Sequence, residues 1–249
     1  MIGLRPAVAP SSDDLKDLDR ADLSPWFNPF LRYFSVEVER CGGEVRLVRN
    51  AQTLEALVVS DPVEGVASVF SRSRALTESW VRARGRYGVF SDFQFEPSTE
   101  VLDIFTGDLA AGPPPHRFRH SVRPISSEDV PSVRDLMQEV NGPSNTRWFD
   151  GLPTATEAGF LAEFDGRLAG AGWVSKVGAH ARLHSLSVRA PYRRIGLGTD
   201  LLFARLIWAR RAGASAALSE ISQDNRASQA IAVRAGMRPV GQIYFHRPL

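Results

Sequence analysis

The fold of this chain is decided by the stretch Arg193-Arg194-Ile195-Gly196-Leu197-Gly198, which leads directly into Thr199-Asp200-Leu201-Leu202-Phe203. Two glycines two positions apart let backbone amides converge on an anion, because no side chain intervenes and unusual dihedral angles are allowed. A helix that begins directly after such a loop adds unpaired amides and the positive end of its dipole. The stretch is typical of a phosphate-binding loop, although a tight turn that binds nothing could carry the same glycines.

Both flanks place this loop between a strand and a helix. The segment 183–188, Leu-His-Ser-Leu-Ser-Val, has the alternation of a half-buried strand. Apolar residues then recur at helical spacing from Leu202 to Ala209, and Gly213 follows as a stop signal. Three charged residues lie off the apolar stripe of this helix: Asp200, Arg205 and Arg210. The glycines therefore lie at a strand-loop-helix junction.

The segment 187–198 resembles the pyrophosphate-binding motif of the GCN5-related N-acetyltransferases (GNAT), whose core is Arg or Gln, two residues, Gly, one residue, then Gly or Ala. Arg193, Gly196 and Gly198 fill that pattern. A second segment is similar to the family's next strand and helix: a strand over 217–221, then a helix from Asn225 that closes before Gly236-Met237. The resemblance covers residues 117–249, about the size of one such domain.

The remaining residues of this half predict the same kind of architecture. Ser126-Ser127-Glu128-Asp129 has the composition of a helix start, and an apolar stripe follows to Val140. Strands over 160–164 and 168–174 flank a tight turn at Asp165-Gly166. The predicted fold class is therefore α/β, with a GNAT-like mixed central sheet flanked by helices in the C-terminal half.

A separate N-terminal domain is predicted over residues 1–110. Residues 111–116, Ala-Gly-Pro-Pro-Pro-His, have the composition of a linker, which leaves 117–249 as the GNAT domain. The first half predicts strands over 45–49, 54–60 and 66–71 and a helix over 76–83, an order that resembles half of the same fold. Its glycines at 85 and 88 follow a helix and precede a strand, the wrong order for a cofactor loop. We expect a smaller, noncatalytic α/β domain.

Composition limits the classes of function. The chain has 249 residues, of which 43% are hydrophobic, but no apolar run long enough to span a membrane and no leader pattern over 1–14. These features predict a cytoplasmic protein, and the single cysteine, Cys41, allows no intrachain disulfide. Residues 1–116 have a net charge of −5 and residues 117–249 of +7. The basic half suits a phosphate-bearing ligand, although an arginine-rich composition would give the same excess.

The resemblance implies an N-acetyltransferase that moves an acetyl group from acetyl-CoA, used as a co-substrate, to a primary amine. The oxyanion donor would be a backbone amide at Val188 or Ser187. For Asn225 and Ser228, contact with the pantetheine arm and simple helix capping are both open. The cofactor-binding residues that the resemblance implies are Leu186, Ser187, Val188, Arg193, Arg194, Ile195, Gly196, Leu197, Gly198, Thr199, Asn225 and Ser228.

Proton transfer needs a base and an acid, for which the sequence offers several candidates. Glu220, at the end of a predicted strand, is the first candidate base, and His184 is the second because imidazole titrates in the useful range. Many GNAT relatives have a Tyr in the last helix that protonates the thiolate, but Ala232 occupies that position here. Tyr244, Tyr192 or water could replace it, and a chain that binds CoA as a sensor or assembly module without turnover is the alternative.

The acceptor is predicted to be a small-molecule or peptide amine that meets Trp148 and Phe149, two aromatics in a polar loop. Anchoring of the loop to the core is the competing interpretation of these aromatics. His116 and His120 have helical spacing, but no neighbouring carboxylate or cysteine in the sequence completes a metal site, so no metal is expected. The scattered arginines do not favour a nucleic-acid partner, no membrane partner is expected, and a homodimer is left open.

Overall fold

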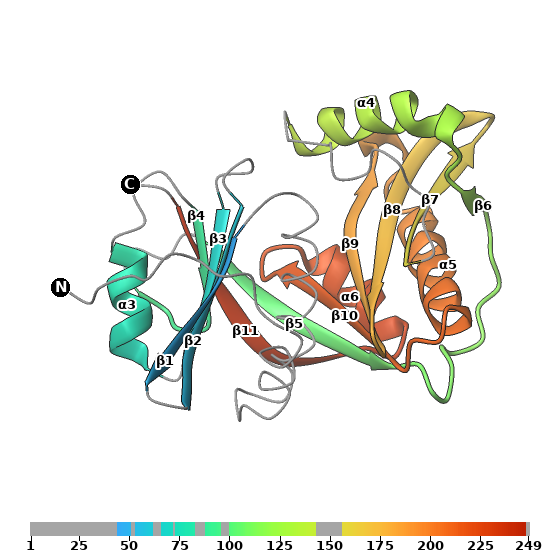
Figure 1. Cartoon of the computed structure of the whole chain (residues 1–249). Helices are drawn as coiled ribbons and strands as arrows, with labels where there is room; N and C mark the ends of the chain where they lie inside the picture. Colours follow the sequence, from blue (N-terminus) through green and yellow to red (C-terminus); the bar gives the residue numbers. More distant parts are fainter. Residues whose placement is uncertain are drawn as a thin grey trace. The chain divides into compact units, whose positions relative to one another are not determined.

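We describe a computed structural model of the chain over residues 44–50, 53–61, 66–71, 73–82, 88–95, 100–142 and 156–247 (Figure 1). The chain divides into two compact units, one formed by residues 104–240 and the other by residues 1–103 with 241–249. The division falls within a strand at residue 103, earlier than the predicted domain end at residue 110. Residues 111–116 lie inside the second unit, and the end of the chain belongs to the first.

The second unit is built on a mixed sheet. Its strands lie in the order β5-β10-β9-β8-β7-β6. Strands β6 to β9 pair antiparallel in succession, whereas β9 and β10 are parallel. The bounds are β5 Glu100–Asp108, β6 Ser121–Pro124, β7 Glu157–Phe164, β8 Arg167–Val177, β9 His180–Val188 and β10 Ala216–Ser222.

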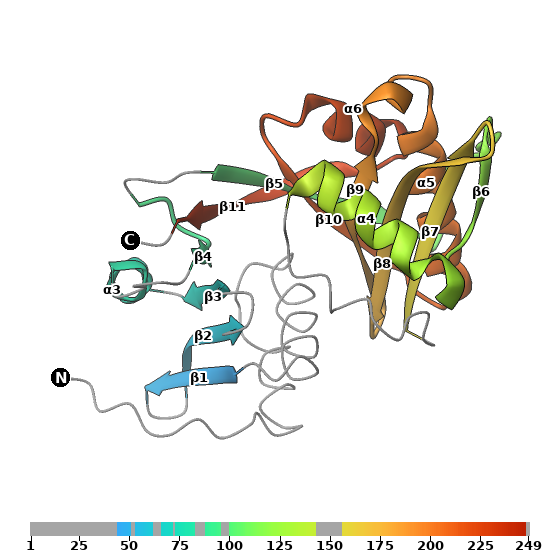
Figure 2. The same cartoon turned by 90° about the horizontal axis from the view of Figure 1, so that it is seen from above.

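Helices cover both faces of this sheet (Figure 2). Helix α4 (Val130–Asn141) packs against one face, where Leu136 contacts a cluster containing Leu161 and Trp173. Helices α5 (Leu197–Arg211) and α6 (Arg226–Arg234) belong to the core on the other face, with Phe160 and Val174. Because side chains alternate along a strand, residues of β7 and β8 contribute to both cores. The predicted α/β class with a mixed sheet and flanking helices is confirmed.

The predicted hairpin is also confirmed. Asp165 and Gly166 join β7 to β8 with φ angles of 50° and 71°, the two positive values that a tight two-residue turn requires. The turn places Phe164 opposite Arg167 and fixes the register of both strands. The register shifts by one residue between Glu163 and Ala162, and this shift places Glu157 opposite Ser175.

Strand β9 is irregular in two ways that shape the unit. It pairs with β10 from His180 to Arg182, and no pairing of the two strands continues beyond that point among the described residues. Its pairing with β8 shifts by one residue between His184 and Ser187, which leaves a bulge at residues 185 and 186. Ser185 has a φ of +52° there, a left-handed value that non-glycine residues seldom adopt. Strands β9 and β10 therefore separate beyond Arg182 and form a V, next to the bulge of β9.

The first unit contains a sheet in the order β1-β2-β3-β4-β11. Strands β1, β2 and β3 form an antiparallel meander, and α3 connects β3 to the parallel strand β4. Val58, Val69 and Val81 are buried in its core. The strands and the helix predicted for this half are present. Their bounds are β1 Glu44–Asn50, β2 Thr53–Asp61, β3 Val66–Ser71, α3 Arg74–Arg82, β4 Gly88–Ser91 and β11 Arg238–His246.

Candidate functional site

The glycine loop has the backbone geometry of an anion cradle. Arg194 has a φ of +69° and Gly196, the residue before α5, a φ of +108°. Among the described residues, no backbone carbonyl outside α5 accepts a hydrogen bond from the amides of residues 194–198. The Thr199 amide, which the sequence also assigned to the cradle, instead donates to the carbonyl of Gly196 at 3.0 Å. The free amides of a loop with left-handed residues, placed at a helix N-terminus, suit a phosphate group.

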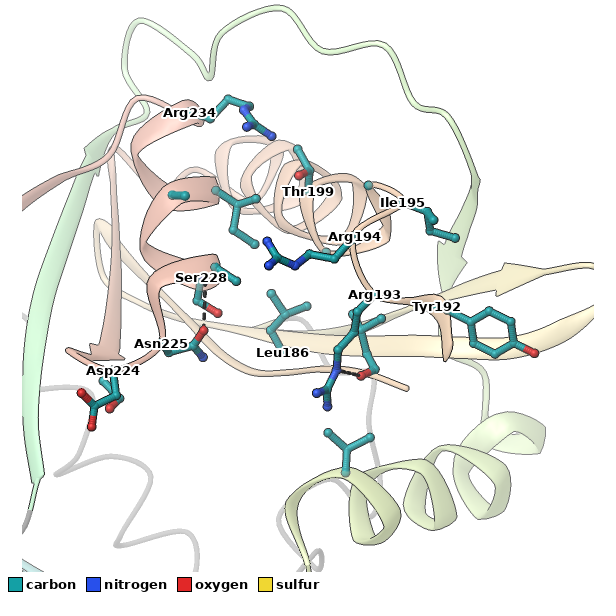
Figure 3. A pocket seen from close by; sticks show the side chains of 18 of the residues that line it. Leu186, Tyr192, Arg193, Arg194, Ile195, Thr199, Asp224, Asn225, Ser228 and Arg234 are labelled. Atoms are coloured by element: carbon teal, nitrogen blue, oxygen red, sulfur yellow. Dashed lines mark hydrogen bonds between the residues drawn. The ribbon is translucent and has the colours of Figure 1, made fainter. Parts of the chain in front are cut away.

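A cavity of about 840 Å³ adjoins these amides, and we call it the loop cavity. Figure 3 shows Arg194, Thr199, Asn225 and Ser228 around it. Of the twelve predicted cofactor-binding residues, ten line this cavity; Ser187, which is buried, and Leu197, also buried, do not. The residues that line it are Arg119, Val140, Asn141, Leu186, Val188, residues 192–196, Gly198, Thr199, Ser222, Asp224, Asn225, Ala227, Ser228, Ala230, Ile231 and Arg234.

Asn225 and Ser228 serve a structural role as well as lining the cavity. The Asn225 side chain accepts a hydrogen bond from the Ser228 amide at 3.1 Å and caps the N-terminus of α6. The Ser228 side chain lies on the first turn of the same helix. Both interpretations left open by the sequence are therefore compatible with the geometry.

Arginines surround the loop cavity, but they are not equivalent. Arg193 donates from Nε to the carbonyl of Val188 at 2.9 Å and ties the loop to the end of β9. Arg194, Arg119 and Arg234 also line the cavity, and each is exposed. Exposed guanidinium groups beside an amide cradle add positive charge where a pyrophosphate would lie.

Residues 116–120 form a strap that holds the start of α5. The carboxylate of Asp200 is only 1% exposed and contacts His116 Nε2 and His120 Nδ1, each at 2.7 Å. It also accepts hydrogen bonds from the backbone amides of Arg119 and His120. His116 stacks on Phe203 with ring centroids 4.1 Å apart. The strap places Arg119 next to Gly196, where a Cβ would lie 3.6 Å from Arg119 Cδ.

This arrangement corrects the sequence interpretation of the two histidines. A carboxylate does approach them, but it comes from α5, 80 residues further along the chain from His120. Its two oxygens hydrogen-bond to the two imidazoles. Within the described parts of the chain, no cluster of three or more His, Cys, Asp or Glu side chains could hold a metal ion.

A second cavity, of about 220 Å³, lies where β9 and β10 separate, and we call it the splay cavity. Both candidate bases, Glu220 and His184, line it, as do Ser185 and Ala232. The two cavities adjoin, because five residues line both: Leu186, Ser222, Asn225, Ser228 and Ile231. A ligand held at the glycine loop could therefore extend toward the two candidate bases.

Glu220 is already engaged in an ion pair. Its Oε1 lies 2.7 Å from Nε of Arg182, and only 8% of its side chain is exposed. The pair links β10 to β9 directly at the opening of the V. To act as a base, this oxygen would have to give up a charge-assisted hydrogen bond.

His184 is engaged differently, through two hydroxyl groups. Its Nε2 lies 3.0 Å from Ser175 Oγ, and its Nδ1 lies 3.1 Å from Ser185 Oγ. Ser175 Oγ in turn donates to Glu157 Oε1 at 3.0 Å. Sequence reasoning missed Glu157 and Ser175. The available signal was one polar residue near one end of each of two strands with apolar centres.

A buried arginine of α5 hydrogen-bonds to the backbone at the bulge. Arg205 of α5 is 2% exposed and donates from Nη1 to the carbonyls of Trp173 and His184, both at 3.2 Å. Gly172 leaves room for it, because a Cβ there would lie 3.2 Å from Arg205 Cζ. Burial lowers the pKa of Arg205 to about 9. The carbonyls of Trp173 on β8 and His184 on β9, beside the bulge, thus accept from a donor that the sheet does not supply.

Asp200 and Arg205 show where the helical pattern was misleading. The sequence placed both off the apolar stripe together with Arg210, yet only Arg210 is exposed. Asp200 and Arg205 can be buried because the strap binds the carboxylate of Asp200 and the carbonyl of His184 at the bulge accepts from Arg205. Helix α5 is therefore buried over a wider part of its surface than its apolar stripe predicts.

The other predicted site residues lie elsewhere. Tyr244 belongs to the first unit, where its hydroxyl donates to Gln242 at 3.2 Å and its side chain lines a pocket with Arg74 and Asp92. The structure does not bring it among the residues that line the loop or splay cavities. Trp148 and Phe149 lie outside the described residues. Tyr192 does line the loop cavity.

Comparison with known proteins agrees with this geometry. Residues 125–237 match the model of the Acetyltransferase (GNAT) family. This part of the chain is therefore similar to the GNAT family. The family match begins after the strap and ends after α6, so it contains the glycine loop and both sides of the V. A search of curated proteins gives no match.

Solved structures of GNAT proteins share the fold. A GCN5-related N-acetyltransferase from Kribbella flavida is 12% identical, with a TM-score of 0.61 over 86% of this chain and 93% of that chain. One from Sphaerobacter thermophilus is 16% identical, with a TM-score of 0.60 over 80% of this chain and 78% of that chain. A tandem GNAT protein from the clavulanic acid biosynthesis pathway is 18% identical, with a TM-score of 0.61 over 96% and 95%. The last likeness extends into the first unit.

One further feature concerns membranes. No helix among the described residues has both the length and the apolar character needed to cross a bilayer.

Proposed function

We propose that this GNAT protein transfers an acetyl group from acetyl-CoA to a primary amine in a ternary complex. The observation that carries the proposal is the junction of the two cavities. The glycine loop and its free amides fit a pyrophosphate, and the adjoining splay cavity contains two ionisable side chains, His184 and Glu220. Residues 194–198, with Asn225 and Ser228, would hold the CoA arm along this path.

The chemistry needs few groups. The amine nitrogen, once uncharged, attacks the thioester carbonyl; a C–N bond forms, the C–S bond breaks, and the electron pair leaves with sulfur. The proton that the amine loses goes to a base in the splay cavity, and the thiolate takes one from water. A backbone amide at the end of β9 would stabilise the oxyanion, as the resemblance implies for Val188 or Ser187.

Binding of the coenzyme is tested best at Gly198. A Cβ there would lie 3.5 Å from Ile231 Cδ1, an ordinary contact, and its φ is not in the left-handed region, unlike that of Gly196. Gly198→Asp places a negative charge in the cradle at a position where a carboxylate favours the helix. We expect acetyl-CoA affinity to fall by about 100-fold or more, because like charges about 4 Å apart repel by ~4 kcal/mol at an effective dielectric constant of 20.

Gly198→Asn is the matched control, because it has the same size without the charge. Calorimetry should show much weaker acetyl-CoA binding for Gly198→Asp than for Gly198→Asn. Equal affinity in the two variants and in the unaltered protein would contradict the assignment of the loop.

A second function, CoA binding without turnover, is favoured by one specific observation. Ala232 is buried and lines the splay cavity, and no tyrosine is among the described residues that line it. Release of free thiol from acetyl-CoA over a panel of primary amines separates the two functions. Amine-dependent release supports the transferase, whereas tight binding with no release from any amine supports a sensor or assembly module.

A further inference from the structure

A chain of hydrogen bonds reaches the splay cavity from a carboxylate that no sequence motif indicates. Glu157 on β7 is 6% exposed and Ser175 on β8 is 3% exposed. The two residues face each other across the strand pair, and the chain continues from Ser175 to His184 on β9. Three neighbouring strands therefore contribute one residue each to a single line of polar groups.

The chemistry of these groups fixes the direction of the hydrogen bonds. Ser175 donates its single hydroxyl proton to Oε1 of Glu157. The Ser175 oxygen must then accept a hydrogen bond, and the donor within reach is an N–H on Nε2 of His184. Neutral His184 consequently has its proton on Nε2 and an unprotonated nitrogen at Nδ1.

The unprotonated Nδ1 faces a residue at the cavity. Nδ1 contacts the hydroxyl of Ser185, which lines the splay cavity and has the left-handed backbone of the bulge. Three other charged groups lie nearby: Arg205 donates to the His184 carbonyl, and Glu220 is paired with Arg182 across the V. The strained backbone at Ser185 is maintained by its surroundings, as is common at functional sites.

We propose that Glu157 and Ser175 are positioning residues that make Nδ1 of His184 the base of the acetyl transfer. Ser175 selects the tautomer, and the charge of Glu157 stabilises the imidazolium that forms. This inference rests on the proposed function, which it deepens by choosing His184 over Glu220 and by naming the groups that act through it.

In the step itself, the ammonium form of the acceptor loses a proton to Nδ1, directly or through the hydroxyl of Ser185, which gives one proton and takes another. The uncharged amine then attacks the thioester carbonyl; a C–N bond forms, the C–S bond breaks, and the thiolate leaves with its electron pair. The second proton that the nitrogen loses on becoming an amide goes to that thiolate through water, which gives the free thiol. His184 keeps both ring protons as imidazolium until Nδ1 releases its proton to water. No oxidant, reductant or further reactant is needed.

The first experiment reads the tautomer in the protein without substrates. Long-range ¹H–¹⁵N spectra distinguish protonated from unprotonated ring nitrogens, and His184→Gln identifies the signal. Near the alkaline end of the titration we expect Nε2–H for the unaltered protein and a mixture of tautomers for Ser175→Ala. An Nδ1–H tautomer in the unaltered protein would overturn the proposal. The same tautomer population in Ser175→Ala and in the unaltered protein would also overturn it.

The second experiment measures the pH dependence of kcat/KM with Glu157→Gln. Glutamine can still accept from Ser175, so the tautomer stays, but the loss of negative charge favours neutral imidazole. The acid limb should therefore move to lower pH and the plateau should fall about tenfold, part of the about 10²-fold that a general base contributes at the least. Glu163→Gln, the same change at a less buried position on β7, should leave both unchanged.

An acid limb that Glu157→Gln leaves in place would count against the role of Glu157. If no amine is acetylated by the unaltered protein, the proposed function fails, whereas the tautomer measurement still decides whether Ser175 orients His184.

Discussion

The loop cavity and the splay cavity adjoin, yet they are built by different means. At the loop, residues 194–198 present backbone amides, and the arginines around them are exposed. At the splay, the polar groups are side chains from separate strands, held by partners that are themselves buried, such as Ser175 and Glu157. Anion binding depends mainly on backbone conformation, whereas proton transfer depends on which side chains the sheet brings together.

The difference predicts distinct effects of substitution. Changes to the groups that hold the loop should be seen first in stability and coenzyme binding. Changes at the splay should be seen first in turnover. Three experiments compare the two cavities, beginning with the largest expected effect.

The strap that holds the loop should be the most sensitive element. Asp200→Asn replaces a buried carboxylate that accepts four hydrogen bonds, and the new amide group would oppose donors. We expect the free energy of unfolding to fall by about 3 kcal/mol, because removal of one member of a buried charged network leaves its partners unpaired. Urea denaturation measures this loss, and hydrogen exchange over 197–211 locates it.

Asp224→Asn is the control for this experiment, since Asp224 lines the loop cavity but is exposed. It should change stability by no more than about 0.5 kcal/mol. Equal effects of the two variants would mean that the strap does not stabilise α5.

At the splay, His184 and Glu220 should differ in their effect on turnover. His184→Gln should lower kcat/KM by about 10²-fold, the lower end of what a general base contributes. Glu220→Gln should lower it by less than about tenfold, because its Oε1 is already bonded to Arg182. Steady-state kinetics with one acetylated amine measures both, and the reverse order would make Glu220 the base.

The smallest effect is expected for a substitution that removes the hydrogen bonds to the bulge. Arg205→Met leaves the carbonyls of Trp173 and His184 without their donor while it removes a buried charge. We expect a loss of about 2 kcal/mol in the free energy of unfolding, the usual cost of unsatisfied buried acceptors. Arg210→Met, at an exposed position on the same helix, should be close to neutral in thermal denaturation; a similar loss there would point to helix propensity instead.

The elements themselves were largely predictable from local patterns. The Asp165-Gly166 turn, the strand before the loop and the helix after it follow from turn chemistry and from periods of two and 3.6 residues. Asp200 and Arg205 were not predictable in the same way. Their burial depends on a strap 80 residues away and on a bulge in another strand, which no local period encodes.

The candidate site residues also fall into a group that local sequence predicts and a group that it does not. Most of the predicted coenzyme contacts line one cavity, because they are consecutive or share a motif. Tyr244 was proposed from its residue type and its place in the terminal strand, and the structure puts it in the first unit. Glu157 and Ser175 were missed because their relation to His184 depends on the register of three strands.

The loop, the helix behind it and the family resemblance could be inferred from the sequence, because spaced glycines and a following helix are local features. Which side chains meet where β9 and β10 separate could be learned from the folded chain alone. The V, the bulge at Ser185 and the line from Glu157 to His184 arise from strand pairing, which joins residues that are distant along the chain.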